Sequence, residues 1–354
     1  MIENIYRGLE DAGYSKTEIE KEKTFLYIGY SSYNEYSHAL TKLHGINKKN
    51  IYLNKPAMIG KNISAILGIN GPVINIDTAC SSSLIGVHMA CNDLRNKKST
   101  IAIVTGGRMV FNIADMESFK IGVESEDGLT RCFDKNSTGT TNSEGFITLV
   151  LKPLAKAKED GNYIYGVVKG SAINQNGTSS GITVPSGRAQ EEVIEKALNR
   201  SKVKIDNIKY IEAHGTGTKI GDNIEIEALA NVLSRYTNKK GVCAVGSIKS
   251  NYGHLCEGSG ILGLVKVLAV MRYNTILPNI NFIKPNVDCN FINSPLYVPM
   301  RSEKIKDEYY CCGLSSFGLS GSNCHVIIEK YNNKYENILN LKHKFNYKKC
   351  WPIK

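Results

Sequence analysis

Residues 73–84 read VINIDTACSSSL, a stretch that predicts a β-strand delivering a cysteine to the start of a helix. Residues 73–76 favour a strand, and residues 77–79 favour a turn. From Ser81 onward, apolar side chains recur at steps of three and four, which is helical spacing. Cys80 therefore falls at a helix N-terminus, where free backbone N–H groups and the helix dipole favour a thiolate. The alternative is a small thiol buried between strand and helix.

Two later segments each place a histidine just after an expected strand. The segment YIEAHGTGTKIGD begins with a short apolar strand and carries His214. The segment VCAVGSIKSNYGHLCEGSG begins in the same way and carries Lys249 and His254, ahead of an apolar helix. Open α/β sheets place their chemistry beyond the carboxyl ends of strands. We therefore expect Cys80 and the two histidines to meet as a nucleophile with two imidazoles.

Strands and helices are expected to alternate along the chain, which predicts an α/β protein with layered sheets and helices. A turn containing residues 156–161 is expected to join two of the strands, and no sequence repeat is evident. Further strands are expected at 25–28, 100–105, 145–151, 164–170, 210–213 and 324–329, and a helix at 190–199.

The composition suits a globular protein with a sizeable core. The chain has 354 residues, of which 42% are hydrophobic and 22% charged. It contains neither an apolar run long enough to span a membrane nor a secretory signal, so a cytoplasmic protein is expected. Ten irregularly spaced cysteines predict reduced thiols, with no zinc site. The net charge of +11 is scattered and not interleaved with aromatic residues, so no nucleic-acid partner is expected.

Four ordered motifs, DTACSSSL, EAHGTGT, KSNYGH and SSFGLSGSNCHVIIE, resemble those of β-ketoacyl synthase (ketosynthase) domains. The similarity is greatest to domains of modular polyketide synthases in the thiolase-like superfamily. It implies a thiolase-like α/β fold, with two similar α/β halves in a layered αβαβα arrangement. The expected units are residues 1–158 with Cys80, residues 159–330 with the histidines, and residues 331–354.

Both ends of the chain carry an expectation from this resemblance. The motif LEDAGY, near residue 9, lies well inside a complete ketosynthase, so the N-terminal strand region is expected to be missing from a truncated or split domain. Residues 331–354 resemble a basic-aromatic linker that follows a ketosynthase and packs back on its surface. The alternative for that segment is a disordered terminus.

The activity that the resemblance implies is a decarboxylative Claisen condensation. Cys80 accepts an acyl chain, and a malonyl-type extender on the phosphopantetheine of an acyl carrier protein loses CO₂ and attacks it. Both steps form an oxyanion, which needs hydrogen-bond donors. For acyl transfer we expect the backbone N–H groups of Cys80 and Leu319, with Gly318 allowing a close approach. For the extender we expect His214 and His254.

Supporting roles are also implied by the resemblance. Lys249 and Glu225 match a buried ion pair of the family, with Lys249 organising the histidines. Thr216 and Thr218 match positions that hold the pantetheine arm, although turn capping is the alternative. Leu319 matches a gate of the acyl pocket. No metal or bound cofactor is expected. Two further histidines are expected to be structural: His88 and His325.

The partners implied are an acyl carrier protein, a second copy of the chain and neighbouring polyketide synthase domains, without nucleic acid or membrane. Three other functions compete with elongation. The chain could be an inactive or split fragment that serves as an assembly or carrier-docking module, or a transacylating, non-elongating ketosynthase. A thiolase would need a second catalytic cysteine in the late loop, where this chain has FGLSGSN.

Overall fold

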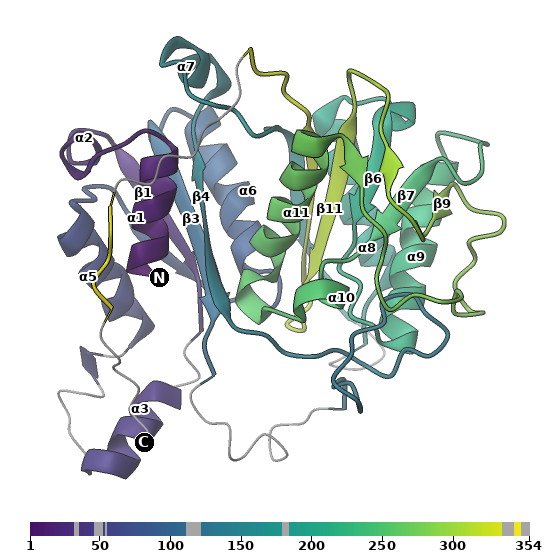
Figure 1. Cartoon of the computed structure of the whole chain (residues 1–354), viewed down its shortest axis with the longest axis horizontal. Coiled ribbons are helices and arrows are strands. Elements are labelled where there is room, and N and C mark those ends of the chain that lie inside the picture. The colour runs from purple at the N-terminus through teal and green to yellow at the C-terminus, as the bar shows by residue number, and fades with distance from the viewer. Residues whose placement is uncertain are drawn as a thin grey trace.

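The computed structural model describes residues 1–31, 35–45, 52–53, 55–110, 122–178, 184–334 and 343–347. Within them lie two large sheets (Figure 1). The first has the order β2-β1-β3-β4, with bounds β1 (Thr24–Gly29), β2 (Val73–Ile76), β3 (Ile101–Arg108) and β4 (Gly145–Leu151). The second has the order β5-β12-β11-β6-β7-β9, with bounds β5 (Val167–Gln175), β6 (Ile208–Glu212), β7 (Cys243–Gly246), β9 (Leu296–Tyr297), β11 (Cys311–Phe317) and β12 (Ser322–Glu329). A small antiparallel pair joins β8 (Thr275–Ile276) and β10 (Glu303–Lys304).

Helices form three layers around these sheets. One outer layer, α1 (Ile2–Asp11) and α5 (Pro56–Leu67), packs on the first sheet. The other, α8 (Gly187–Ser201) and α9 (Lys219–Ser234), packs on the second. Between the sheets lie α6 (Ser82–Arg95) and α11 (Ser259–Tyr273) (Figure 1). The expected αβαβα arrangement is therefore confirmed. The remaining helices are α2 (Lys16–Ile19), α3 (Glu35–His44), α7 (Leu154–Glu159), α10 (Lys249–Tyr252), η2 (Ile205–Asn207) and η3 (Cys256–Gly258).

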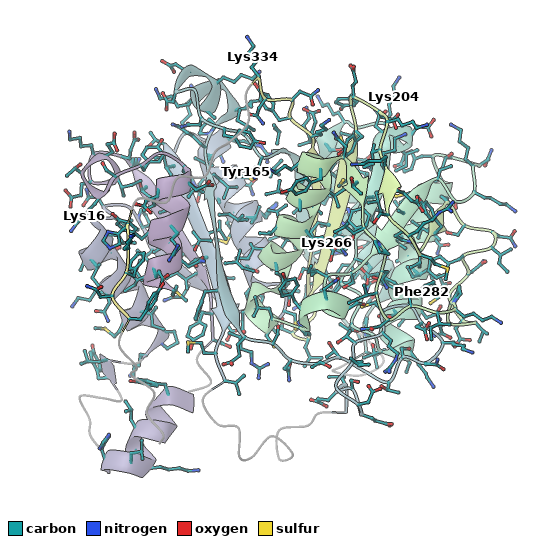
Figure 2. The ribbon with its side chains drawn as sticks, viewed as in Figure 1. Lys16, Tyr165, Lys204, Lys266, Phe282 and Lys334 are labelled. Carbon is teal, nitrogen blue, oxygen red and sulfur yellow. The ribbon has the colours of Figure 1, made fainter. Side chains whose placement is uncertain are left out.

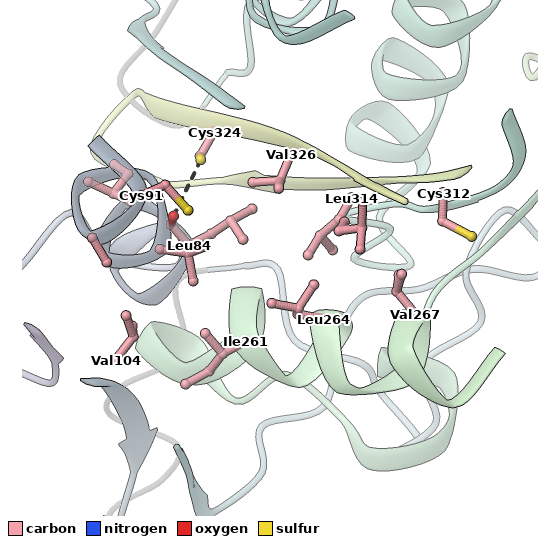
Figure 3. Packing of buried hydrophobic residues seen from close by; sticks show 14 of the residues in the cluster. Leu84, Cys91, Val104, Ile261, Leu264, Val267, Cys312, Leu314, Cys324 and Val326 are labelled. Carbon is pink, nitrogen blue, oxygen red and sulfur yellow. Dashed lines mark hydrogen bonds between the residues drawn. The ribbon is translucent and has the colours of Figure 1, made fainter. Parts of the chain in front are cut away.

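The two central helices are largely buried, as their sequences require. Helix α6 buries seven consecutive residues from Ser82 to His88, which leaves no solvent-facing side in that stretch, whereas Val265 of α11 is 43% exposed. A Cβ added at Gly260 of α11 would lie 2.6 Å from the Leu84 Cβ, so glycine is needed where the helices meet. The Cys324 thiol donates to the Leu84 carbonyl at 3.5 Å and ties α6 to β12 (Figure 3). This packing places the start of α6 against the second half of the chain.

The two halves repeat one topology. The series β1–α5–β2–α6–β3–β4 and β6–α9–β7–α11–β11–β12 have the same order. In each, the first strand pairs parallel with the second and third, and the third pairs antiparallel with the fourth. The expected two similar halves are confirmed, although no repeat is visible in the sequence. One difference is that β12 also pairs with β5, whereas β4 pairs with β3 alone among the described residues.

Most expected elements are confirmed to within a few residues, but two expectations were wrong. The strand expected at 164–170 is β5, which begins at Val167. The Asn333 side chain bonds both the N–H (3.0 Å) and the carbonyl (2.8 Å) of Ile164, which removes that residue from strand pairing. The expected turn at 156–161 is largely helix α7, because alanine, lysine and glutamate favour a helix.

Some of the expected C-terminal linker packs back on the protein. Within residues 343–347, the Tyr347 hydroxyl donates to Glu3 of α1 at 2.7 Å, and the His343 ring lies 5.0 Å from that of Tyr6. The rest of that linker after residue 334 lies outside the described residues. Among the residues that the structure describes, no helix has both the length and the apolar character needed to cross a bilayer.

Candidate active site

Cys80 lies in a tightly held turn between β2 and α6. Ala79 adopts a left-handed conformation with φ of 53°, which turns the chain sharply before the cysteine. The Ser82 hydroxyl accepts from the Thr78 N–H at 2.8 Å and donates to the Ala79 carbonyl at 2.6 Å. The Cys80 carbonyl accepts from Ser316 Oγ of β11 at 2.9 Å. The turn is thus fixed both within the first half and against the second.

The environment of the Cys80 thiol differs from the expectation. Burial raises the pKa of the Cys80 thiol to about 12, and the neighbouring Cys256 adds to this effect. Lys249 and the backbone N–H of Leu319, which donates to the sulfur, act in the opposite direction. The expectation that the helix N-terminus favours a thiolate was therefore wrong, because desolvation has the larger effect on this pKa. A raised pKa favours the protonated thiol in the resting site at neutral pH.

Glycine at position 318 lets a loop from the second half reach this thiol. A Cβ at Gly318 would lie 2.2 Å from the Thr78 carbonyl oxygen and 2.8 Å from Ser81 Oγ. Ser320 Oγ also donates to the Thr78 carbonyl at 3.1 Å. The close approach expected of Gly318 is confirmed. Leu319, with 41% of its surface exposed, lies next to the cysteine at the protein surface.

The two motif histidines lie together, with ring centroids 5.6 Å apart and nearly perpendicular planes. Nδ1 of His254 accepts from the Cys256 N–H at 3.1 Å, so the ring hydrogen is on Nε2. Nδ1 of His214 lies 3.5 Å from Nζ of Lys249, an ammonium that can only donate, which gives the same tautomer. Burial, followed by the charge of Lys249, holds the pKa of both imidazoles well below the usual value. Both imidazoles are therefore held neutral, and their Nδ1 partners favour the tautomer with hydrogen on Nε2.

Glu225 supports the His214 loop in a way that the sequence did not reveal. Its carboxylate accepts from the backbone N–H groups of His214 (2.7 Å) and Gly215 (2.8 Å). Burial raises the pKa of Glu225 to about 7. Within the described residues it makes no ion pair with Lys249, whose ammonium donates to the His214 carbonyl instead. The expected ion pair was therefore wrong, although the charge of Lys249 still lowers the pKa of Glu225 and partly offsets the effect of burial.

Asp222, which sequence reasoning missed, has a similar role at a position one turn earlier in α9. Its oxygens accept from the N–H groups of Phe133 (2.6 Å) and Gly217 (3.0 Å), and burial raises its pKa to about 7. The hydroxyls of Thr216 and Thr218 lie 2.9 Å apart in the loop that leads from β6 into α9. Thr218 is the N-cap residue of α9 but its side chain makes no capping bond, so the turn-capping alternative does not hold for Thr218.

The buried ion pair that the structure does contain joins Lys266 of α11 and Glu212 of β6, with Nζ and Oε2 3.2 Å apart. The sequence held a signal for this pair. Lys266 lies inside an apolar helix and Glu212 ends an apolar strand, and both are positions where burial is expected. The two other histidines are structural, as expected. They are buried and bond to neighbouring polar side chains: His88 to Ser171 and Asn92, and His325 to Ser315.

Two family models match this chain. The N-terminal domain of beta-ketoacyl synthases matches residues 1–157, and the C-terminal domain matches residues 165–283. The chain belongs to the β-ketoacyl synthase family. It is 40% identical over 336 residues to the polyketide synthase PksL of Bacillus subtilis, and 37% identical over 349 residues to PksM of the same organism. Each alignment covers 93% of this chain.

Solved ketosynthases have the same fold. A ketosynthase from module 6 of the bacillaene synthase of Bacillus subtilis 168 superposes with a TM-score of 0.88 at 38% identity, over 94% of this chain. One from module 1 of the bacillaene synthase of Bacillus amyloliquefaciens FZB42 gives 0.87 at 34% identity. The present ketosynthase chain spans 58% of the module 6 structure, 7% of PksL and 8% of PksM.

Proposed function

We propose that this chain catalyses chain elongation in polyketide biosynthesis, as an acyltransferase of the β-ketoacyl-acyl-carrier-protein synthase type. The observation that carries the proposal is the pairing of His214 and His254, whose rings lie 5.6 Å apart and whose Nδ1 contacts favour hydrogen on Nε2. Such donors match an oxyanion that forms only during reaction. The neighbouring Cys80, contacted by the Leu319 N–H, supplies the nucleophile.

The first half reaction transfers the acyl chain to the enzyme. The Cys80 sulfur attacks the carbonyl carbon of an acyl thioester, and the oxyanion accepts from the backbone N–H groups of Cys80 and Leu319. When this intermediate collapses, the thioester C–S bond breaks. The pantetheine thiol of the donor carrier leaves with the proton that Cys80 lost. Because the resting thiol is protonated, this transfer releases no net charge into the buried site.

The second half reaction extends the chain. The malonyl-type thioester loses its carboxylate as CO₂, and the electron pair moves into an enolate whose oxygen accepts from His214 and His254. The enolate carbon then attacks the acyl carbon on Cys80, the C–S bond to Cys80 breaks, and the cysteine takes up a proton. The product is a β-ketoacyl chain on the carrier. Burial, with the charge of Lys249 as a second contribution, keeps both imidazoles neutral so that their Nε2–H groups can donate.

The proposal includes the partners. Thr216 and Thr218 hold the pantetheine arm, the only prosthetic group involved, which the carrier protein brings. Some of the excess positive charge docks the acidic carrier. The enzyme acts in the cytoplasm as a homodimer, beside other polyketide synthase domains. The units at residues 1–158, 159–330 and 331–354 also belong to this proposal.

The test separates elongation from its competitors. The chain is incubated with an acyl pantetheine thioester and malonyl-loaded carrier protein. Intact-protein mass spectrometry then follows the Cys80 adduct, and chromatography follows the β-ketoacyl product. Elongation predicts both species. An adduct without extension would instead support a transacylating ketosynthase, and neither species would support a non-catalytic module. Labelling that persists in Cys80→Ala would contradict the assigned nucleophile.

A further inference from the structure

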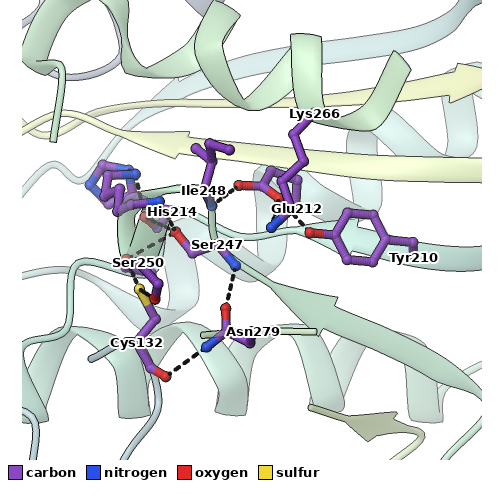
Figure 4. Close-up of polar contacts among 11 residues, drawn as sticks. Cys132, Tyr210, Glu212, His214, Ser247, Ile248, Ser250, Lys266 and Asn279 are labelled. Carbon is purple, nitrogen blue, oxygen red and sulfur yellow. Dashed lines mark hydrogen bonds and ion pairs between the residues drawn. The ribbon is translucent and has the colours of Figure 1, made fainter. Parts of the chain in front are cut away.

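The buried pair of Lys266 and Glu212 is connected directly to the catalytic loops. Glu212 is the last residue of β6, two positions before His214. Its Oε1 accepts from the N–H of Ile248, the residue before Lys249, at 2.5 Å. The Glu212 side chain thus links the ends of β6 and β7, at the point where the strands pass into the loops that carry His214 and Lys249 (Figure 4).

The other oxygen of Glu212 is bound from α11. Oε2 pairs with Nζ of Lys266 and accepts from the Tyr210 hydroxyl. Nζ also lies 5.6 Å from the centre of the Tyr210 ring. The side chains of Lys266 and Glu212 are 5% and 1% exposed. In Figure 2, the labelled lysines at positions 16, 204 and 334 lie at the edge of the molecule, whereas Lys266 is buried.

Helix α11 holds the second histidine as well. Ser259, its first residue, has Oγ 2.7 Å from Nδ1 of His254. Ser259 and Lys266 are seven residues apart, which is two helical turns, so they lie on the same face. One rigid helix therefore contacts the His254 loop at its N-terminal end and, through Glu212, the His214 and Lys249 loops two turns later.

The surrounding backbone leaves room for this group of side chains. A Cβ at Gly246 would lie 2.9 Å from the Tyr210 hydroxyl and 3.5 Å from Lys266 Nζ, and one at Gly263 would lie 3.1 Å from Glu212 Cγ. Buried ion pairs are often no more stabilising than apolar side chains of similar volume. Stability alone therefore does not account for a charged pair in this core, whereas its bond to the catalytic loop does.

We propose that Lys266, Glu212 and Tyr210 are positioning residues, which through α11 fix the spacing between the two catalytic imidazoles. The inference rests on the proposed function, because the imidazole spacing matters for the decarboxylation and condensation half reaction. Acyl transfer depends on Cys80 and Leu319, which this group does not contact. The group should therefore affect the second half reaction much more than the first.

The experiment compares the two half reactions in the full chain. The variant Glu212→Leu/Lys266→Met replaces the pair with apolar side chains of similar size. The matched control is Lys209→Met, which removes an ion-paired lysine of the same strand whose partner, Asp307, lies at the surface. We expect the ratio of condensation rate to Cys80 acylation rate to fall at least tenfold in the double variant and to stay within twofold in the control.

A ratio that stays at the wild-type value in the folded double variant would overturn the inference. If the double variant does not fold, Tyr210→Phe removes a single hydroxyl and still decides the question. The expected fall in the ratio is then about threefold, and an unchanged ratio refutes the positioning role.

A readout without turnover separates this inference from the proposed function. In protein labelled with ¹³C at histidine Cε1, the signals of His214 and His254 report tautomer and environment. We expect both signals to shift in the variant that folds and neither to shift in Lys209→Met. Unmoved signals would overturn the inference. A wild-type chain that neither acylates nor condenses would refute the proposed function, while these signals still decide the positioning role.

Discussion

Replacing Gly318 with alanine should move the loop between β11 and β12, which carries the Leu319 N–H, away from Cys80. The new Cβ would lie 2.2 Å from the Thr78 carbonyl oxygen and 2.8 Å from Ser81 Oγ, whereas real Cβ contacts essentially never fall below 3.0 Å. The loop must therefore retreat by about 1 Å, and a misplacement of that size is worth roughly a hundredfold in rate. It also draws the Leu319 N–H away from the Cys80 sulfur, and losing one oxyanion donor costs about 10²–10³ in rate.

The assay is the rate of Cys80 acylation by an acyl thioester, followed by intact mass. We expect Gly318→Ala to acylate about a hundredfold more slowly than wild type and to melt a few degrees lower, because Gly318 itself is buried. The control is Gly187→Ala at the start of α8, where a Cβ would meet its nearest neighbour at an ordinary 3.5 Å. Acylation at the wild-type rate by Gly318→Ala would refute the assignment of this loop as the oxyanion site.

Four further outcomes are expected. His254→Ala should keep Cys80 acylation within about tenfold but lose condensation by roughly a hundredfold, and normal extension in a product assay would exclude it from the site. Burial raises the pKa of Glu225 from 4.5 to about 7. Between these two pH values the folded state binds more protons than the unfolded state. The free energy of unfolding should therefore fall as the pH rises from 4.5 to 7, by up to about 3 kcal/mol. Glu225→Gln should flatten the pH dependence in denaturant titrations at pH 4.5 to 7.5; an unchanged slope would contradict this. Phe345→Ala should lower the melting temperature by a few degrees, since its ring packs on Tyr6 and under Arg7, and no change would mean that the tail contributes nothing. Light scattering at low micromolar concentration should show a dimer, and a fully active monomer would contradict that proposal.

The positions of Cys80 and the two histidines could be predicted because their signals are local. Each follows a short apolar strand, and the structure places Cys80 after β2, His214 after β6 and His254 after β7. The αβαβα layering followed from the family resemblance and is confirmed. Strand β11 was not anticipated, because its sequence CCGLSSF is buried throughout and shows no alternation of polar and apolar residues.

The features that escaped prediction depend on contacts between distant segments. The ion pair between Lys266 and Glu212 forms because α11 packs over β6. The two residues are far apart in the sequence, so no local spacing pattern predicts their contact. The protonation of Cys80 was misjudged because the helix terminus was visible in the sequence but the desolvation was not. The tautomers of the histidines likewise follow from partners that only the folded chain brings together.

The repeated topology of the two halves has an evolutionary consequence. The loop after β2 and the loop after β7 are equivalent in the repeat, and each leads into a central helix, α6 or α11. The first loop carries Cys80, the proposed nucleophile, whereas the second is longer and carries Lys249 and His254. If the halves arose by duplication, the ancestral protein had two identical loops, one in each half. Each loop has since specialised for one step of the proposed reaction. A change in one loop would then have to be matched by the other, because the proposed site is complete only when both halves are present.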